Sequence, residues 1–175
     1  MLTINLAFKF RNLDFKFEAT VRRGEVHNFE KQYPDLFEPA LRDKLFWVLC
    51  GLDRGYTGKI EGEGLCFNAS SFNNVLAIGD RSMFVRGSVR RNIYKALRLR
   101  ADRKTAQKRT DEVIELYNLK KLENLNVKLL EDGELVTVAL ARAHFRRIGL
   151  VIYKGALEYV EILLQKYKDA YIIVV

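Results

Sequence analysis

The sequence is poor in the features that mark membrane, fibrous and disulfide-rich proteins. Its 175 residues include only 11 glycines and 2 prolines, which excludes collagen-like and low-complexity chains. No apolar run approaches the ~20 residues that would span a bilayer. The stretch from Met1 to Phe10 alternates and contains Lys9, so it lacks the apolar core of a signal peptide. We therefore expect a cytoplasmic chain that does not cross the membrane.

Metal ligands are scarce as well. The chain has two cysteines, Cys50 and Cys66, and two histidines, His27 and His144, with no CxxC and no zinc-type spacing. We expect buried, reduced thiols and neither a metal site nor a bound cofactor. The remaining composition, 49% hydrophobic and 30% charged, is that of a globular protein, and the length fits a single domain over 1–175.

The net charge of +8 comes from one segment. Residues 81–110 contain eleven basic residues and one acidic residue, Asp102, so the rest of the chain is slightly acidic. Apolar residues recur there with helical spacing and are expected to share the buried side of a helix, with basic residues between them: Val89, Ile93, Ala96, Leu97 and Leu99. This pattern predicts a candidate partner-binding basic face formed by Arg86, Arg90, Arg91, Lys95, Arg98 and Arg100. The alternatives are a merely solvated helix face and contact with nucleic acid or anionic lipid.

Hydrophobic periodicity predicts an α/β protein. Expected strands lie over 1–10, 13–19, 25–29, 75–78, 150–153 and 170–175. Expected helices lie over 35–50, with Asp35 as N-cap, and over 88–99, 102–117, 133–147 and 156–167. The alternating start predicts antiparallel strands, whereas the strand–helix–strand order at the end predicts parallel pairing.

Five motif-like segments then follow one another in a family-like order. They are VRRGEV at 21–26, GLDRGYTGKI at 51–60, FVRGSVRRNI at 84–93, LEDGE followed by VALARA within 130–143, and LVIY at 150–153. In this order they resemble the nucleotide-binding domain of ABC transporters, nearest the molybdate-type importers. The resemblance implies an ABC ATPase-like (P-loop NTPase-like) fold: a parallel core sheet, an N-terminal antiparallel β part and a helical subdomain at about 88–147, truncated at the C-terminus before the switch histidine (H-loop).

The positions where this family performs its chemistry carry other residues. The resemblance places the phosphate-binding loop (Walker A) between Gly24 and Gly51, yet residues 25–50 contain no glycine, and Glu30 to Asp35 stand there instead. After the strand at 150–153, where the family has a Mg²⁺-binding aspartate and a glutamate (Walker B), come Lys154 and Gly155. Lysine cannot ligate Mg²⁺, and glycine cannot act as a base.

Two further motifs of the family also differ. The Q-loop glutamine falls near Gly79 or Asp80, and the signature motif reads Glu131, Asp132, Gly133, Glu134, with carboxylates in place of its serine and first glycine. Carboxylates at a helix start are also ordinary caps. The Gly-Lys pair within 55–60 does not fit a P-loop, because Asp53 and Ile60 stand where glycine and serine or threonine are required. We interpret it as a turn, and we expect the stretch from Gly55 to Gly64 to be a turn followed by a hairpin-like segment.

These replacements predict a non-catalytic protein, a pseudo-ATPase that serves as scaffold or regulatory partner of a transport component such as an ABC permease. Docking to a permease would place it at the cytoplasmic face of the membrane. Three alternatives stay open. One is weak ATP binding without hydrolysis, with Phe10 or Phe15 stacked on adenine rather than in the sheet core. The second is a basic nucleic-acid- or anion-binding protein that uses residues 81–110. The third is a decayed reading frame that still folds.

Overall fold

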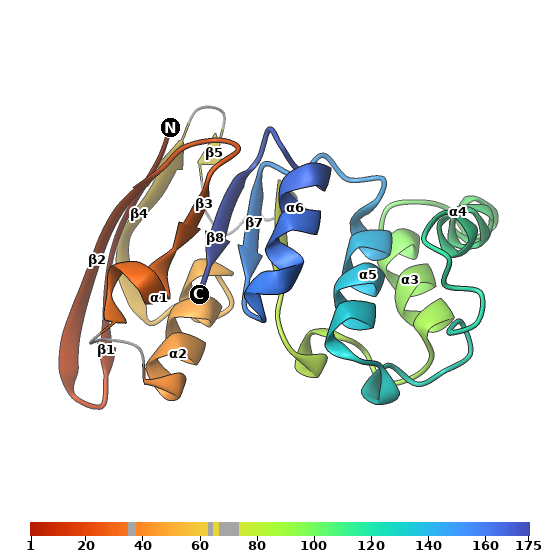
Figure 1. Cartoon of the computed structure of the whole chain (residues 1–175), viewed down its shortest axis with the longest axis horizontal. Coiled ribbons are helices and arrows are strands. Elements are labelled where there is room, and N and C mark those ends of the chain that lie inside the picture. Colours follow the sequence, from red (N-terminus) through yellow and green to blue (C-terminus); the bar gives the residue numbers. More distant parts are fainter. Residues whose placement is uncertain (35–37, 63–64, 67–73) are drawn as a thin grey trace. The chain divides into compact units, whose positions relative to one another are not determined.

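The computed structural model describes residues 1–34, 38–62, 65–66 and 74–175. These residues form two compact units (Figure 1). The sheet unit comprises residues 1–77 and 147–175, and the helical unit comprises residues 78–146. Asp35 and the end of the predicted hairpin at 63–64 lie outside the described residues, and so does the side chain of Cys66.

The first sheet of the sheet unit is antiparallel. Its strands run in the order β2 (Leu13–Val21), β1 (Leu2–Phe10), β4 (Tyr56–Gly62) and β5 (Leu65–Cys66). Every second residue of β1 from Leu2 to Phe8 is buried, which confirms the strand predicted from alternation.

The predicted turn at 55–60 is wrong, because residues 56–60 belong to strand β4. Gly58 sits opposite strand β1 with φ +108°, and a Cβ there would lie 2.1 Å from the carbonyl oxygen of Asn5. Its glycine is therefore explained by the close approach of two strands.

The second sheet forms the core of the same unit. Its order is β3 (Val26–Asn28), β8 (Tyr171–Val174), β7 (Leu150–Tyr153) and β6 (Val75–Ile78). Strands β3 and β7 both run parallel to β8. The element order predicts this for β7 and β8. All residues of β7 and β8 are buried, which is typical of a parallel sheet covered on both faces.

Three short or medium helices complete the sheet unit. They are α1 (Phe29–Gln32), α2 (Pro39–Leu49) and α6 (Val160–Lys166), the last preceded by a 3₁₀ turn over Leu157–Tyr159. Helix α2 begins later than predicted, with Glu38 rather than Asp35 in the N-cap position. Pro39 explains the later start, because proline suits the first helical position and keeps the residue before it extended.

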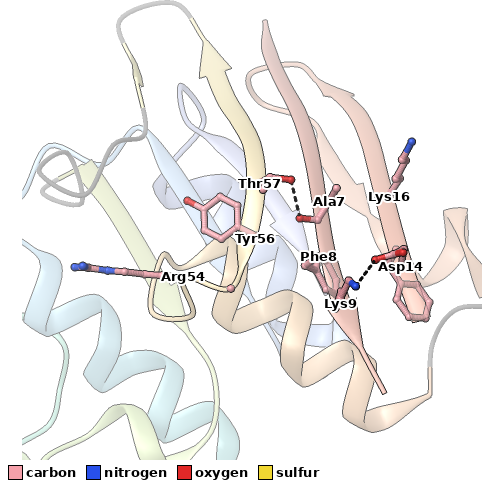
Figure 2. A pocket seen from close by; sticks show the side chains of 10 residues that line it. Ala7, Phe8, Lys9, Asp14, Lys16, Arg54, Tyr56 and Thr57 are labelled. Atoms are coloured by element: carbon pink, nitrogen blue, oxygen red, sulfur yellow. Dashed lines mark hydrogen bonds and ion pairs between the residues drawn. The ribbon is translucent and has the colours of Figure 1, made fainter. Parts of the chain in front are cut away.

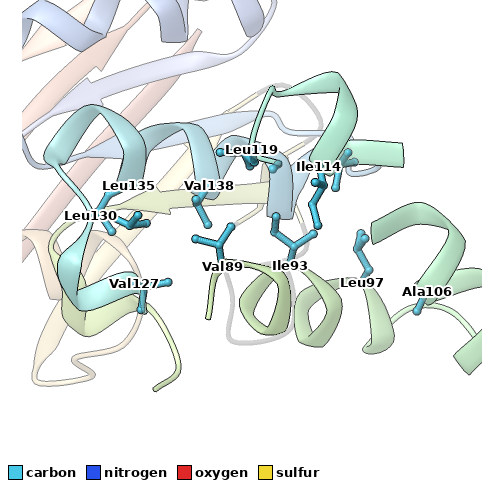
Figure 3. Close-up of a cluster of buried hydrophobic side chains, with 12 residues drawn as sticks. Val89, Ile93, Leu97, Ala106, Ile114, Leu119, Val127, Leu130, Leu135 and Val138 are labelled. Atoms are coloured by element: carbon cyan, nitrogen blue, oxygen red, sulfur yellow. The ribbon is translucent and has the colours of Figure 1, made fainter. Parts of the chain in front are cut away.

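The helical unit contains three helices, α3 (Val89–Arg98), α4 (Arg103–Leu116) and α5 (Asp132–Ala143), with 3₁₀ turns over Arg81–Met83 and Val127–Leu129. The side chains of Ser88 and Asp102 cap α3 and α4, as their positions predict. Figure 3 shows the cluster between the helices, formed by buried residues that include Val89, Ile93, Leu97, Ile114, Leu119 and Val138.

Two predictions for this unit are wrong. Helix α5 ends at Ala143, with His144 as its C-cap, rather than running to Arg147. Leu99 does not join the buried side of α3: the helix ends at Arg98, and the Leu99 side chain is 86% exposed.

Candidate functional site

The residue after strand β7 is Lys154, and it is bound to helix α2. Its Nζ lies 2.5 Å from the Asp43 carboxylate and 5.7 Å from the ring centroid of Phe46. The lysine side chain is only 17% exposed. The positive charge at this edge of the sheet is therefore held in place by a carboxylate and an aromatic face of one helix.

Gly155 follows Lys154 at a tight turn. The Tyr153 hydroxyl donates to the carbonyl oxygen of Ala156 at 2.9 Å, which folds the tyrosine ring back over the turn. A Cβ on Gly155 would lie 2.4 Å from that hydroxyl oxygen. The glycine thus makes room for the Tyr153 side chain, a structural reason for its presence.

An open pocket of about 490 Å³ lies beside Lys154. Its charged lining residues are Glu30, Arg42, Asp43 and Lys154. The Arg42 Nε donates to the carbonyl oxygen of Val175 at 2.8 Å, and its terminal nitrogen lies 4.0 Å from the Glu30 carboxylate. The pocket therefore contains equal numbers of acidic and basic side chains, and the basic ones already have partners.

The start of helix α2 lies at the same pocket and has few N–H groups to offer an anion. Pro39 has no N–H, and the N–H groups of Leu41 and Arg42 both donate to the Glu38 carbonyl oxygen at 3.1 Å. Helix N-termini bind phosphate through backbone N–H groups that lack partners within the helix. Among the first three positions of α2, Pro39 and Leu41 therefore have no N–H group available, whereas the bond from Arg42 is the one that any helix makes at that position.

The predicted signature region, Glu131 to Glu134, forms the first turn of α5. The Glu131 N–H donates to the Glu134 carboxylate at 2.8 Å, and Asp132 lies 3.6 Å from the Arg81 guanidinium. Carboxylates in the first turn complement the positive end of the helix dipole. The capping interpretation of these acidic residues is confirmed.

Five of the six residues predicted for the basic face have exposed side chains. Arg86, Arg91, Lys95, Arg98 and Arg100 are exposed.

Arg90 was placed on this basic face in error. Its guanidinium hydrogen-bonds Asp111 at 2.7 Å and Glu123 at 3.0 Å, and the side chain is 31% exposed. These bonds, that to Asp111 above all, raise the pKa of Arg90. Arg90 faces α4 and the segment before α5, so its charge is neutralised inside the helical unit.

A second pocket, of about 480 Å³, lies on the antiparallel sheet (Figure 2). Phe8, Phe15 and Tyr56 stand in one cross-strand row and line it. The ring of Phe15 stacks on Phe8 with centroids 6.0 Å apart and is half-buried. Phe10 is also half-buried, but it does not line this pocket. Sequence reasoning missed Tyr56, because the pairing of β4 with β1 that aligns Tyr56 with Phe8 leaves no signal in the local sequence.

The remaining candidate ligands lie apart. His27 on β3 packs edge-on against Phe29 at 4.9 Å, and burial lowers its pKa. His144, in the other unit, lies 3.1 Å from the Tyr117 hydroxyl through Nδ1. Cys50 is buried as predicted, and burial raises the pKa of its thiol to about 12. Within the described ranges, no three histidine, cysteine, aspartate or glutamate side chains gather as metal ligands would.

Comparison with known proteins identifies the fold. No family model matches the sequence. In solved structures, cbiO1 from Clostridium perfringens, part of the ABC transporter complex cbiONQ, superposes on 99% of this chain and 77% of its own with a TM-score of 0.65 at 14% identity. The ATP-binding cassette MJ0796, solved as a post-hydrolysis dimer with ADP and Pi, gives a TM-score of 0.65 over 99% of this chain and 87% of its own at 11% identity. The fold is that of an ABC ATP-binding domain.

A sequence relative agrees with this ABC-type fold. The aliphatic sulfonates import ATP-binding protein SsuB of Bacillus subtilis (strain 168) is 32% identical over 105 residues. The match covers 60% of this chain and 40% of SsuB, so the chain spans well under half of the length of that relative. In the described part of the chain, no helix is both long and apolar enough to cross a bilayer.

Within this ABC-type fold, sequence reasoning missed Arg42, Asp43 and Phe46. All three lie on α2 and contact the end of the chain or the turn after β7. Asp43 and Lys154 are 111 residues apart, and neither stands in a local motif that would connect them. Only the packing of α2 beside β7 brings the two charges together.

Proposed function

We propose that the chain is a non-catalytic relative of ABC transporter ATP-binding subunits that acts as a scaffold or regulatory partner of a transport component. The ion pair between Lys154 and Asp43 carries this proposal. In the family that the sequence resembles, the position after this strand supplies a carboxylate for Mg²⁺. An ammonium has no lone pair to donate and repels the cation, so Mg²⁺ lacks a ligand here.

The start of helix α2 supports the same proposal. Residues 25–50 contain no glycine for a phosphate-binding loop, and Pro39 and Leu41 have no free N–H group for a triphosphate. Glu30 and Asp43 add negative charge to the adjoining pocket. At the metal-ligand position, Lys154 is paired with Asp43. At the phosphate-binding position, the N–H group of Leu41 is bonded to the Glu38 carbonyl oxygen. Neither half of a MgATP site is thus left to bind its ligand.

MgATP titration tests the proposal directly. We expect no heat of binding by calorimetry at micromolar nucleotide and no release of phosphate above a protein-free blank. Lys154→Ala serves as the matched variant, because any phosphate release from a contaminating ATPase is the same for parent and variant. Micromolar binding together with turnover that Lys154→Ala changes would overturn the proposal.

The partner follows from the relatives. SsuB is an import protein and cbiO1 is part of a transporter complex, so we propose a permease or another ABC subunit as the partner of this chain. Co-purification of the tagged chain with products of neighbouring genes tests this. A stable complex with a transport component supports the proposal, and none under conditions that capture an intact ABC complex contradicts it.

A second candidate function is weak ATP binding without hydrolysis. The open pocket lined by Phe8, Phe15 and Tyr56 favours it, since the basic residue Arg54 also belongs to its lining. Adenine stacking there would be weakened by Phe15→Ala and left unchanged by Lys154→Ala. Titration with a fluorescent ATP analogue in EDTA distinguishes this candidate from the first.

A further inference from the structure

The turn between α3 and α4 presents a leucine to solvent on a fixed frame. Ala101 packs partly buried against the core of the helical unit, and the Arg98 guanidinium donates to its carbonyl oxygen at 2.8 Å. The Asp102 carboxylate accepts the N–H groups of Lys104 and Thr105 at 2.9 and 3.0 Å. Among the described residues, Leu99 has the largest exposed fraction of any large hydrophobic side chain, at 86%.

Basic side chains surround this leucine. Residues 95–104 include one acidic residue, Asp102, whose carboxylate is engaged in capping α4. They also include five basic residues, all exposed: Lys95, Arg98, Arg100, Arg103 and Lys104. The turn thus exposes one apolar side chain, Leu99, among five exposed basic side chains.

We propose that the segment 95–104, the basic tip, binds an anionic lipid surface, with Leu99 entering the acyl boundary and the surrounding basic side chains contacting the headgroups. Basic residues close to an anionic leaflet each add to the attraction, and an inserted apolar side chain adds a contribution that salt does not screen. The two features reinforce each other at an anionic membrane surface. This inference goes beyond the proposed function and does not depend on whether the chain binds or hydrolyses ATP.

The composition of the tip favours lipid over nucleic acid. Proteins that bind single-stranded nucleic acid stack bases on exposed aromatic side chains. The aromatic residue of α3, Tyr94, is instead half-buried and packs against the core of the helical unit. The exposed apolar side chain of the tip is aliphatic, which suits a hydrocarbon environment and offers no face for stacking.

Vesicle co-sedimentation of the full chain tests the proposal. We expect binding to vesicles of phosphatidylcholine mixed with phosphatidylserine, little binding to phosphatidylcholine alone, and weakening as salt rises. Leu99→Gln should weaken binding about tenfold, and the double variant Arg98→Gln, Arg100→Gln about tenfold or more.

Leu129→Gln is the matched control. Leu129 is also an exposed leucine of the helical unit, at 74%. It belongs to the 3₁₀ turn over Val127–Leu129. Figure 3 shows the side chains of Val127 and Leu130 at the opposite end of the hydrophobic cluster from those of Leu97 and Ala106. Binding by this variant should equal that of the parent. Circular dichroism shows whether each variant keeps its helices.

A second measurement reports insertion itself. The emission of Leu99→Trp should shift to the blue on vesicles that contain phosphatidylserine and stay unchanged on phosphatidylcholine, measured against the parent with Trp47 alone. The proposal is overturned if Leu99→Gln binds as the parent does, if neutral vesicles bind equally well, or if the chain binds DNA or RNA more tightly than lipid with no dependence on Leu99.

Discussion

At the scale of single residues, the two positions after strand β7 carry the main functional argument. Lys154 and Gly155 were predicted from the sequence to be unfit for Mg²⁺ chemistry. The structure adds a physical reason for each residue: Lys154 is paired with Asp43, and Gly155 makes room for the Tyr153 ring. Both residues are therefore built into local packing, which explains how the fold tolerates them.

The Lys154–Asp43 pair should contribute measurably to stability. Asp43→Asn leaves the largely buried ammonium of Lys154 without its carboxylate, and we expect a loss of about 1 kcal/mol in the free energy of unfolding. Urea denaturation of the parent, of the single variants Asp43→Asn and Lys154→Met, and of the double variant gives the coupling energy of the pair. Asp14→Asn is the control, since its pair with Lys9 is 3.9 Å long and exposed. Equal effects at both sites would show that the pair adds nothing.

At the scale of elements, Arg90 connects three segments of the helical unit. It lies in α3, and its guanidinium donates to Asp111 of α4 and to the carboxylate of Glu123 in the segment before α5. Its backbone N–H also donates to the carbonyl oxygen of Glu123. Helical periodicity correctly predicted α3 and its buried side, but it could not show that Arg90 faces other elements. A wheel drawn for one helix contains no information on its neighbours, so the basic face was predicted one residue too large.

This arrangement gives the helical unit a pH dependence. A hydrogen bond from Lys120, with a second from Arg90, holds the pKa of Glu123 below its usual value of 4.5, against the opposing effect of burial. Its contribution to stability is therefore fully present above pH 4.5 and is lost as the pH falls through the lowered folded-state pKa.

We accordingly expect Glu123→Gln to be less stable than the parent at pH 7, with a smaller difference at pH 3, measured by urea denaturation. Glu115→Gln, on an exposed position of α4, should show no such trend. A difference that stays constant from pH 7 to pH 3 would rule out ionisation of Glu123 as the cause.

At the scale of the whole molecule, two compact units are joined in one chain. Strands β7 and β8 are buried along their whole length, whereas the α3–α4 turn is exposed. Amide hydrogen exchange should be slowest in β7 and β8 and fastest around residues 99–102, because exchange follows local opening. Equal protection of the two regions would contradict this picture of the fold.

The sequence by itself determined most element types and the parallel pairing near the C-terminus, because periodicity and caps are local properties. The ABC-type fold followed from the resemblance of its ordered motifs to a known family. Only the tertiary structure decided that Gly58 lies in a strand, that Arg90 is neutralised by Asp111 and Glu123, that Leu99 is exposed, and that Asp43 pairs with Lys154. The physical reason is common to all four. Each depends on contacts with another segment of the chain or on the residue at which a helix ends. Strand pairing and ion pairs between distant residues cannot be inferred from the local spacing of residue types.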